Sequence, residues 1–492
     1  MSRKRIDAGI IVAFQDGEHR ILRDGCIVVE GNSVVYVGPS YDEPVDEVID
    51  ARNQLVTPGF INTHTHLSES PLDKSMLEDV GSRQFSMSGL AEMLPARGAA
   101  IDAEGRRQSV DYSMAELIRT GTTTVMEIGG IGDYVAEASD KAGLRAYIAN
   151  GYRSGRWLTT DGKKMTYEWN EEAGKTGFKA ALEFIDRIDS TGNSRIKGFL
   201  SPAQIDTCTA ELLQESAEAA KSLEVPLALH VSQSVFEFDE IVQRHGMTPV
   251  EWLESIGFLN KHCILGHVIL TAGNSWVQFD GDDLSILARH EASVAHNVWV
   301  FARRGIAMES FPDYLDAGVN MCLGTDTAPQ SMIEALRWTA VIGKIMRRNT
   351  QKATAADVFN AATLNGAKML GRDDLGRISA GAKADLLFWR TDSMFMAPLR
   401  DPIKNIVYSA TPEDLASVMI DGAWVMSDGR VLNVDEAAVT AALQDAGDRM
   451  WANIGPGHWA GRKTDELAPQ TFADFRADGA ALAGSAAGST VA

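Results

Sequence analysis

Four histidines and one aspartate follow a pattern that favours metal chemistry. His64 and His66 form a His-x-His pair. Alternate residues of a β-strand project to the same face, so both imidazoles can reach one ion. His230, His267 and Asp326 each lie near the end of a later apolar run. Three neutral imidazoles and one carboxylate suit a Zn²⁺-type ion that keeps one position open for water, so the pattern predicts a hydrolytic metal site.

The middle of the chain must supply the elements that bring these residues together. Between about residues 58 and 375, strand-like apolar runs alternate with helical stretches, as parallel β–α units require. Eight strands are expected, at residues 59–66, 122–128, 145–153, 196–204, 226–233, 263–270, 293–300 and 319–327. Eight such units form a (β/α)8 TIM barrel, in which the carboxyl ends of the strands meet at one mouth. The five residues lie at the ends of strands one, five, six and eight, so we expect them to share that mouth.

Each of the five residues also fits an ordinary structural role. A histidine on a strand is often a hydrogen-bonded core residue, and Asp326 in the sequence Gly-Thr-Asp-Thr is typical of a turn. The combination is more specific than its members, because all five stand at equivalent ends of separately predicted strands. The combination therefore favours a shared site over five independent structural roles.

Both ends of the chain have the pattern of short β-strands. Apolar runs separated by turns fill residues 8–57 and return after residue 384. The predicted fold is therefore α/β, with a metal-binding (β/α)8 barrel at residues 58–375 and a small β-sandwich formed by both termini, from residues 1–57 and 376–435. A C-terminal helix and an extended tail rich in Ala, Gly and Ser are expected within residues 436–492.

Composition restricts the classes of protein that fit. The 492 residues include 67 acidic and 46 basic side chains, for a net charge of −21. This balance argues against nucleic acid or an anionic membrane as a partner, because phosphate binding needs clustered Lys and Arg. The four cysteines have no CxxC spacing, the N-terminus lacks a signal-peptide pattern, and no apolar stretch reaches the ~20 residues of a membrane span. We expect a cytoplasmic enzyme that acts on a small molecule.

Several motifs resemble those of the amidohydrolase superfamily. Its strand-one signature is similar to residues 55–66, LVTPGFINTHTH, and its later landmarks are similar to GTTTV at 121–125, LGTD at 323–326 and LGRISAGAKADL at 375–386. The resemblance extends from about residue 8 to residue 430 and implies a metal-bearing barrel with a β-sandwich from both termini. It also implies site roles: the metal ligands are His64, His66, His230 and Asp326, and the catalytic residues are His267 and Asp326.

The end of strand four decides the expected number of metal ions. Members of the superfamily with two ions carry a carboxylated lysine there, whereas this chain has SPAQI at residues 201–205. Lys197 lies at the start of that strand, toward the closed end of the barrel. The resemblance therefore implies one divalent ion, Zn²⁺ in the first place, with Fe²⁺ or Co²⁺ as alternatives.

One departure from the family pattern bears on the substrate. Deaminases of the branch that this chain resembles continue strand five as His-x-x-Glu, and the Glu protonates a ring nitrogen of the substrate. Here the sequence is His230-Val-Ser-Gln233. A glutamine has no titratable proton at neutral pH, so it can orient a substrate but cannot act as a general acid. Ala203 also stands where those deaminases often carry a histidine, and both departures argue against a ring deaminase.

The remaining pattern predicts a hydrolase that cleaves a C–N bond of a small neutral compound. Urea-like, carbamate and N-substituted heteroaromatic substrates of the phenylurea or triazine type fit best. An aminohydrolase (deaminase) or dechlorinase of a nitrogen heterocycle is the alternative, and a metal-free scaffold protein is a remote one. Substrate contacts are expected from Gln233, Glu127, Gln204 and Trp299. Glu127, at the end of strand two, is also a candidate for the role of the missing acid.

The loop after strand one is expected to influence access to the mouth. Residues 68–94 are rich in Met, Phe and Leu, among them Phe85 and Met87, and fit an apolar lid over the site. Simple core packing is the alternative, because Met and Phe commonly fill gaps between elements. The family resemblance also implies a homo-oligomer.

Overall fold

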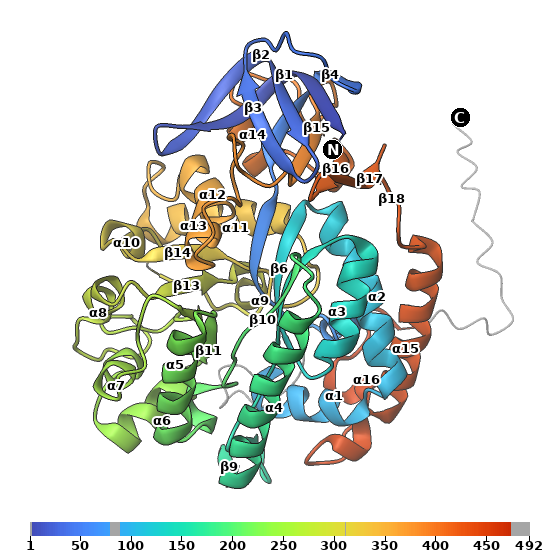
Figure 1. The fold of residues 1–492 in the computed structure, drawn as a ribbon. Helices are drawn as coiled ribbons and strands as arrows, with labels where there is room; N and C mark the ends of the chain where they lie inside the picture. Colours follow the sequence, from blue (N-terminus) through green and yellow to red (C-terminus); the bar gives the residue numbers. More distant parts are fainter. Residues whose placement is uncertain (1, 79–88, 310, 474–492) are drawn as a thin grey trace, which may run out of the picture.

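The centre of the molecule consists of two four-stranded parallel sheets, with the orders β10-β7-β6-β5 and β11-β12-β13-β14 (Figure 1). The structure is a computed structural model that describes residues 2–78, 89–309 and 311–473. The strands are β5 (Phe60–Thr65), β6 (Thr122–Gly129), β7 (Arg145–Asn150), β10 (Ile196–Gly198), β11 (Leu227–Val231), β12 (Cys263–His267), β13 (Ser293–His296) and β14 (Asn320–Leu323). A strand is present at each of the eight expected places.

Among the described residues, the backbone ladders of the two parallel sheets are joined by isolated bridges. Leu200 pairs with Leu227 and Gln204 with His230 at one seam, and Thr65 pairs with Asp326 at the other. The expected TIM-barrel-type α/β fold is therefore present, but its hydrogen-bonded ladder is divided into two halves instead of forming one closed sheet. The reason is local, because β10 and β14, the strands at the two seams, are only three and four residues long.

Helices follow the strands and cover the outside of the barrel. They are α1 (Leu94–Ala100), α2 (Ala103–Arg119), α3 (Gly132–Ala142), α4 (Glu171–Ser190), α5 (Ala210–Leu223), α6 (Val235–His245), α7 (Pro249–Ser255), α8 (Asp283–Arg289), α9 (Val298–Ala302), α10 (Phe311–Asp316), α11 (Met332–Arg347), α12 (Ala355–Ala361), α13 (Leu364–Met369), α14 (Pro402–Tyr408), α15 (Glu436–Gly457) and α16 (Thr464–Leu467). Helix α4 shows why such segments are helical. Asn170 caps its first turn, and Ala181, Phe184, Ile185 and Ile188 form one buried stripe at helical spacing.

The two ends of the chain share one eight-stranded sheet, which lies above the barrel in Figure 1. Its order is β18-β17-β16-β15-β4-β1-β2-β3, with β1 (Arg3–Gln15), β2 (Glu18–Glu30), β3 (Ser33–Gly38), β4 (Glu47–Pro58), β15 (Leu386–Arg390), β16 (Leu415–Ile420), β17 (Ala423–Ser427) and β18 (Arg430–Val431). Strand β4 pairs in parallel with β1 and antiparallel with β15. The predicted pairing of both termini is thus confirmed. The strands form one continuous order instead of two separate sheets, so the sandwich and the exact domain boundaries stay predictions.

A buried ion-pair network joins the barrel to the terminal sheet. Arg145 of β7 lies 3.1 Å from Asp385 and 3.0 Å from Asp421, and its side chain is only 1% exposed. Burial disfavours the charged guanidinium, but the two carboxylates outweigh it and hold the pKa of Arg145 above its ordinary value. Asp385 also accepts the backbone N–H of Asp421. The network therefore connects β7 of the first half-barrel to the residue just before β15 and to the residue just after β16.

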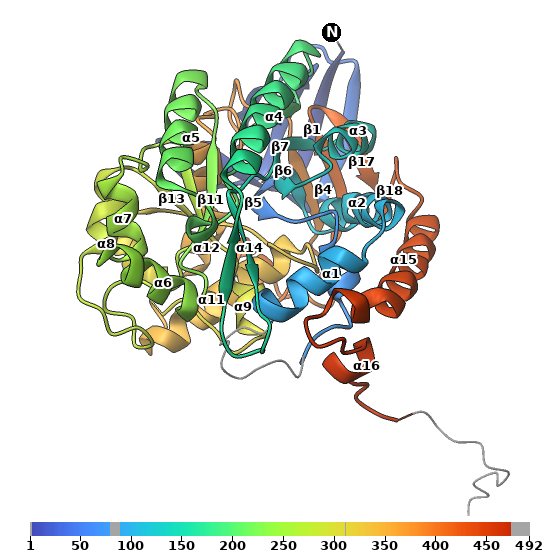
Figure 2. The same ribbon diagram turned by 90° about the horizontal axis from the view of Figure 1, so that it is seen from below.

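The C-terminal helices pack beside the mouth-side helices of the barrel. Helix α15 lies along α1 and α2, and α16 follows beneath it (Figure 2). Their buried residues Ala446, Met450, Ile454 and Leu467 share an apolar cluster with Met93 and Ala96. The expected tail falls on residues 474–492, outside the described residues. Within the described part of the chain, no helix combines the length and apolarity needed to cross a membrane.

The ion-pair network generates a stability prediction. Arg145→Met leaves Asp385 and the partly buried Asp421 without a cation, and the free energy of unfolding should fall by about 3–5 kcal/mol. Urea denaturation followed by circular dichroism measures this change. Arg187→Met is the matched control, because Arg187 pairs with Asp133 on the exposed surface and should change stability by less than about 1 kcal/mol. Equal effects of the two substitutions would contradict the bridging role of Arg145.

Candidate active site

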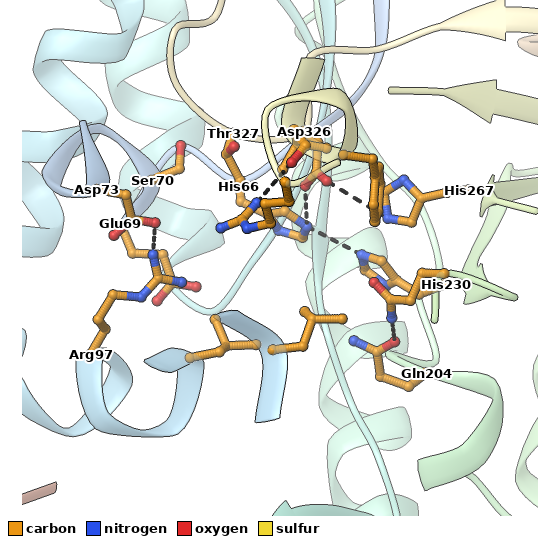
Figure 3. A pocket seen from close by; sticks show the side chains of 16 residues that line it. His66, Glu69, Ser70, Asp73, Arg97, Gln204, His230, His267, Asp326 and Thr327 are labelled. Atoms are coloured by element: carbon orange, nitrogen blue, oxygen red, sulfur yellow. Dashed lines mark hydrogen bonds and ion pairs between the residues drawn. The ribbon is translucent and has the colours of Figure 1, made fainter. Parts of the chain in front are cut away.

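The five predicted residues meet at the carboxyl ends of the parallel strands. Figure 3 shows four of them, His66, His230, His267 and Asp326. His64 lies in β5 and His66 directly after it, His230 lies in β11, His267 ends β12, and Asp326 follows β14. The Nε2 atoms of His66 and His230 are 3.2 Å apart, and Asp326 Oδ1 lies 3.4 Å from His66 Nε2 and 3.8 Å from His64 Nε2. Two triplets therefore have ligand atoms within 4.8 Å of one another: His64, His66 and Asp326, and His64, His230 and His267.

Local backbone contacts and two small residues make room for this convergence. The Asp326 N–H donates to the His64 carbonyl, and the His66 N–H donates to the Asp326 carbonyl, both at 2.8 Å. A Cβ on Gly266 would lie 2.7 Å from the His64 ring, and a Cβ on Gly324 would lie 2.9 Å from the His64 Cβ. Glycine at these two places allows neighbouring strands to approach His64 closely.

The hydrogen bonds of two histidines show that the site fits a metal cation. His66 Nδ1 donates to the Ile128 carbonyl at 2.7 Å, and His230 Nδ1 donates to the Ala203 carbonyl at 2.6 Å. With the proton on Nδ1, each Nε2 carries a lone pair, and the two lone pairs face each other at 3.2 Å. Such a contact is repulsive unless a proton or a metal cation lies between the atoms. Burial lowers the pKa of His66, but Asp326 and Glu127 outweigh it and raise the pKa above its usual value, so the position attracts positive charge.

The other histidines of the cluster agree with this interpretation. The Nε2 atom of His64 is buried and has no hydrogen-bond partner among the described residues. Burial, together with His66, lowers the pKa of His230 to about 3, and burial with the neighbouring imidazoles lowers the pKa of His64 well below its usual range. Neutral imidazole is the form that binds a metal, so this donor set fits a divalent ion. The residues that would hold it are His64, His66, His230 and Asp326.

A cavity of about 110 Å³ opens beside the cluster. Its apolar wall consists of Leu90, Leu94, Val300 and Phe301. Leu90 belongs to the short helix η2 (Gly89–Met93) and Leu94 to α1, so the segment after strand one does line the site with apolar side chains. Phe85 and Met87 of the predicted lid lie outside the described residues.

Two glutamines form the polar wall of the cavity. Gln233 Nε2 donates to Gln204 Oε1 at 2.6 Å, and both side chains line the cavity next to His230. When two carboxamides are joined by one N–H···O hydrogen bond, the NH2 group of one and the carbonyl oxygen of the other are not part of that bond. The backbone N–H groups of Ser232 and Gln233 donate to Glu237 behind the pair, which fixes the turn after β11. The pair therefore presents a neutral donor and a neutral acceptor.

Two of the carboxylates that line the cavity are paired with arginines. Arg97 forms an ion pair with Asp73, and Arg106 lies 2.9 Å from Glu69. Burial opposes ionisation of Glu69, but Arg97 and Arg106 outweigh it, so the pKa of Glu69 lies below its usual value. Asp326 differs, because burial raises its pKa although His66 and Arg304 oppose the shift. Of the carboxyl groups that the described residues place along the cavity, Asp326 is the one that lies among the imidazoles, where it can exchange a proton with a bound water or substrate.

Two expected substrate contacts lie elsewhere. Glu127 Oε2 accepts the Leu67 N–H at 2.9 Å and the Thr65 hydroxyl at 3.0 Å, and burial raises the Glu127 pKa to about 7. This carboxyl group lies under the segment after β5 and is not part of the cavity wall. Trp299 does not line the cavity either. The chain turns into α9 after Asn297, and the Trp299 ring lies against Trp338, 5.3 Å away, in a separate groove with Ser331 and Glu334.

Sequence reasoning missed three residues that bear on this site. Arg97 and Phe301 line the cavity from α1 and α9, two short helices that no sequence motif predicts. Asn297 contacts His267, and its Nδ2 lies 2.7 Å from His267 Nδ1. Asn297 lies in the carboxyl-terminal half of the stretch expected as strand seven, residues 293–300, and this was the available signal, because residues at this end of a barrel strand face the mouth.

Comparison with known proteins agrees with this fold and site. The amidohydrolase family model matches residues 55–425. A 5-methylthioadenosine/S-adenosylhomocysteine deaminase of Thermococcus kodakarensis is 31% identical over 404 residues, 81% of this chain and 89% of that protein. A 5′-deoxyadenosine deaminase of Methanothermobacter thermautotrophicus is 30% identical over 430 residues, 86% of this chain and 94% of that protein.

Solved structures share the same fold at lower identity. An adenosine deaminase from Xanthomonas campestris with bound zinc has a TM-score of 0.80 and 23% identity, covering 91% of this chain and 98% of its own. An atrazine chlorohydrolase from Arthrobacter aurescens complexed with zinc has a TM-score of 0.77 and 22% identity, covering 90% of this chain and all of its own. The fold and the histidine cluster thus define a metal-dependent hydrolase that acts on C–N bonds. The chain belongs to the amidohydrolase family.

The donor set predicts tight binding of a metal ion. After loading with Zn²⁺, the protein should retain one ion per chain, and His230→Ala should lose most of it because a neutral donor opposite His66 is gone. Inductively coupled plasma mass spectrometry measures the stoichiometry. Chelation should also lower the melting temperature, because an ion bound only to the folded state stabilises it. His290→Ala, at a surface contact with Glu254, is the control. Failure to bind Zn²⁺, Fe²⁺ or Co²⁺ would instead support a scaffold role.

Proposed function

We propose that this protein hydrolyses a C–N bond of a small neutral urea-like, carbamate or N-substituted heteroaromatic compound, with one Zn²⁺ ion as its cofactor. The observation that carries the proposal is the neutral Gln204–Gln233 pair at the place where the resembling deaminases carry an acid. Among the described residues that line the cavity, the carboxyl groups besides Asp326 are Glu69 and Asp73, and arginines pair with both. A substrate whose ring nitrogen must be protonated finds no suitable donor among these groups.

A divalent ion held by His64, His66, His230 and Asp326 would supply Lewis acidity and lower the pKa of a water molecule. Asp326, whose carboxylate lies among the ligand imidazoles, then accepts a proton from the attacking water. His267 donates a hydrogen bond to the substrate carbonyl oxygen as negative charge develops there. When the C–N bond breaks, Asp326 returns the proton to the departing amine. Water adds to the carbonyl carbon, the amine leaves neutral, and Asp326 ends as it began.

The cavity walls support this substrate class. The amide pair can accept one N–H and donate to one oxygen or nitrogen of a urea, carbamate or triazine. Leu90, Leu94, Val300 and Phe301 fit an aryl or alkyl substituent on the other side. Arg97 of the wall is paired with Asp73, and Arg304 donates to the Val300 carbonyl. We therefore favour a neutral substrate over an anionic one.

Deamination of a nitrogen heterocycle is the second candidate. The relatives named deaminases favour it, since their identity reaches 31% over most of both chains. It requires a proton donor for the ring nitrogen, and Gln233 cannot fill that role. A dechlorinating reaction, as in the name of one structural neighbour, has the same requirement when the leaving group is on a basic ring.

A substrate panel distinguishes the two candidates. The zinc-loaded protein should release 4-nitroaniline from 4-nitrophenylurea and an amine from aryl carbamates, and it should release no ammonia from 5′-deoxyadenosine, cytosine or pterins. Absorbance and an ammonia assay measure the products. Gln233→Glu should raise ammonia release from 5′-deoxyadenosine by about 100-fold, the usual contribution of a general acid. Efficient ammonia release by the unsubstituted protein would establish the deaminase alternative.

Asp326→Asn tests the proton transfer. Asparagine keeps the shape of the side chain but cannot accept the proton of water, so kcat should fall by at least about 1000-fold with the fold intact. Steady-state kinetics and circular dichroism check the two statements. Asp133→Asn on the exposed surface is the control. An Asp326→Asn protein that keeps more than a few per cent of kcat would rule out the shuttle role.

A further inference from the structure

Asn297 occupies an unusual place for a residue that precedes a helix. It is 1% exposed and lies between β13 and α9, yet its side chain does not cap the helix. The side chain turns toward the mouth, where its Nδ2 lies 2.7 Å from His267 Nδ1 and 3.3 Å from the Ala295 carbonyl oxygen. It therefore connects strand seven to the one histidine of the cluster that is not needed as a metal ligand.

The Ala295 carbonyl identifies which atom of Asn297 faces His267. A carbonyl oxygen can only accept, so the Asn297 atom beside it must be the NH2 nitrogen. The same NH2 group directs its second hydrogen at His267 Nδ1. His267 Nδ1 is then an acceptor, and in the neutral imidazole the proton must be on Nε2.

This arrangement is the reverse of that at His66 and His230. Those two histidines donate from Nδ1 to backbone carbonyls, which leaves a lone pair on Nε2 for a metal. At His267 the partner is a donor, so Nε2 carries a hydrogen and cannot ligate. The His267 Nε2 lies 3.7 Å from Asp326 Oδ2 and its side chain lines the cavity. The chemical nature of the Nδ1 partner thus separates ligand histidines from a hydrogen-bond donor.

Packing holds the Asn297–His267 pair in this geometry. A Cβ at position 324 would lie 2.3 Å from Asn297 Oδ1, so only glycine leaves the space that this amide occupies. The Phe301 ring packs edge-on against His267, with ring centroids 4.5 Å apart. Burial on both sides limits rotation of either side chain.

We propose that Asn297 is a positioning residue that fixes His267 as the Nε2–H tautomer and so makes it a hydrogen-bond donor to the substrate oxygen instead of a base or a fourth imidazole ligand. The catalytic part of this inference rests on the proposed function, whereas the tautomer does not. With His267 committed as a donor, Asp326 is left as the proton acceptor of the site.

The tautomer can be measured on the zinc-loaded full-length protein. Long-range ¹H–¹⁵N correlation spectra of protein labelled with ¹⁵N-histidine distinguish protonated from unprotonated ring nitrogens. The His267 signals are identified as those missing from His267→Gln. We expect an unprotonated Nδ1 and a protonated Nε2. A protonated Nδ1 in the unsubstituted protein overturns the proposal without any measurement of activity.

Asn297→Leu removes the amide with little change of volume. It should abolish the preference for the Nε2–H form and lower kcat on 4-nitrophenylurea by about 100-fold, the usual cost of one misdirected oxyanion donor. The KM and the zinc content should change little, because neither depends on His267 Nε2. Asn297→Asp should reverse the tautomer, because a carboxylate accepts from Nδ1.

Asn320→Leu is the matched control for the loss of a partly buried asparagine. Asn320 lies at the opposite end of the strands and donates to Ser293 Oγ and the Asn365 carbonyl. It should leave the His267 spectrum unchanged. An Asn297→Leu protein with the original spectrum and kcat would contradict the positioning role. Absence of turnover of 4-nitrophenylurea in the unsubstituted protein would count against the proposed function alone, since the spectrum still decides the tautomer.

Discussion

Two imidazole lone pairs facing each other at 3.2 Å are the constraint on which the site depends. Neither His66 nor His230 can turn away, because Ile128 and Ala203 hold their Nδ1 protons through backbone carbonyls. The Ile128 carbonyl belongs to β6, and the Ala203 carbonyl belongs to the segment after β10. The register of neighbouring strands therefore decides where the two Nε2 atoms lie. The fold of the barrel thus places two Nε2 atoms where one cation can bind between them. Metal binding is therefore linked to folding of the mouth.

The described residues of the mouth include two carboxylates paired with arginines and one neutral amide pair. Arginines neutralise Glu69 and Asp73, and the amide pair of Gln204 and Gln233 is neutral at any physiological pH. Asp326 is consequently the group whose protonation can change during a reaction. A site with one proton acceptor and one fixed donor suits a substrate whose own leaving nitrogen completes the proton transfer. The neutral glutamine at position 233 is therefore central to the choice between amide-type and ring substrates.

The sequence correctly predicted that His64, His66, His230, His267 and Asp326 converge, but it predicted little of what surrounds them. Strand periodicity places His64 and His66 on one face, and parallel topology brings the ends of distant strands to one mouth, so residue type and order were sufficient there. Trp299 failed because an apolar run after strand seven is equally compatible with strand and helix, and the chain becomes α9 after Asn297. The single terminal sheet and the contribution of Arg97 depend on long-range packing, for which a local pattern contains no signal.

The pairing of β4 with β15 has a consequence for how the protein is made. Roughly 330 residues separate Pro58 from its partner Leu386. At about 5–20 residues per second, a ribosome needs roughly 15–65 s to produce that stretch. During this interval β4 presents an open edge with unpaired backbone groups, while the whole barrel emerges between the two partners. The open edge of β4 therefore waits for its partner until nearly four-fifths of the chain has been translated.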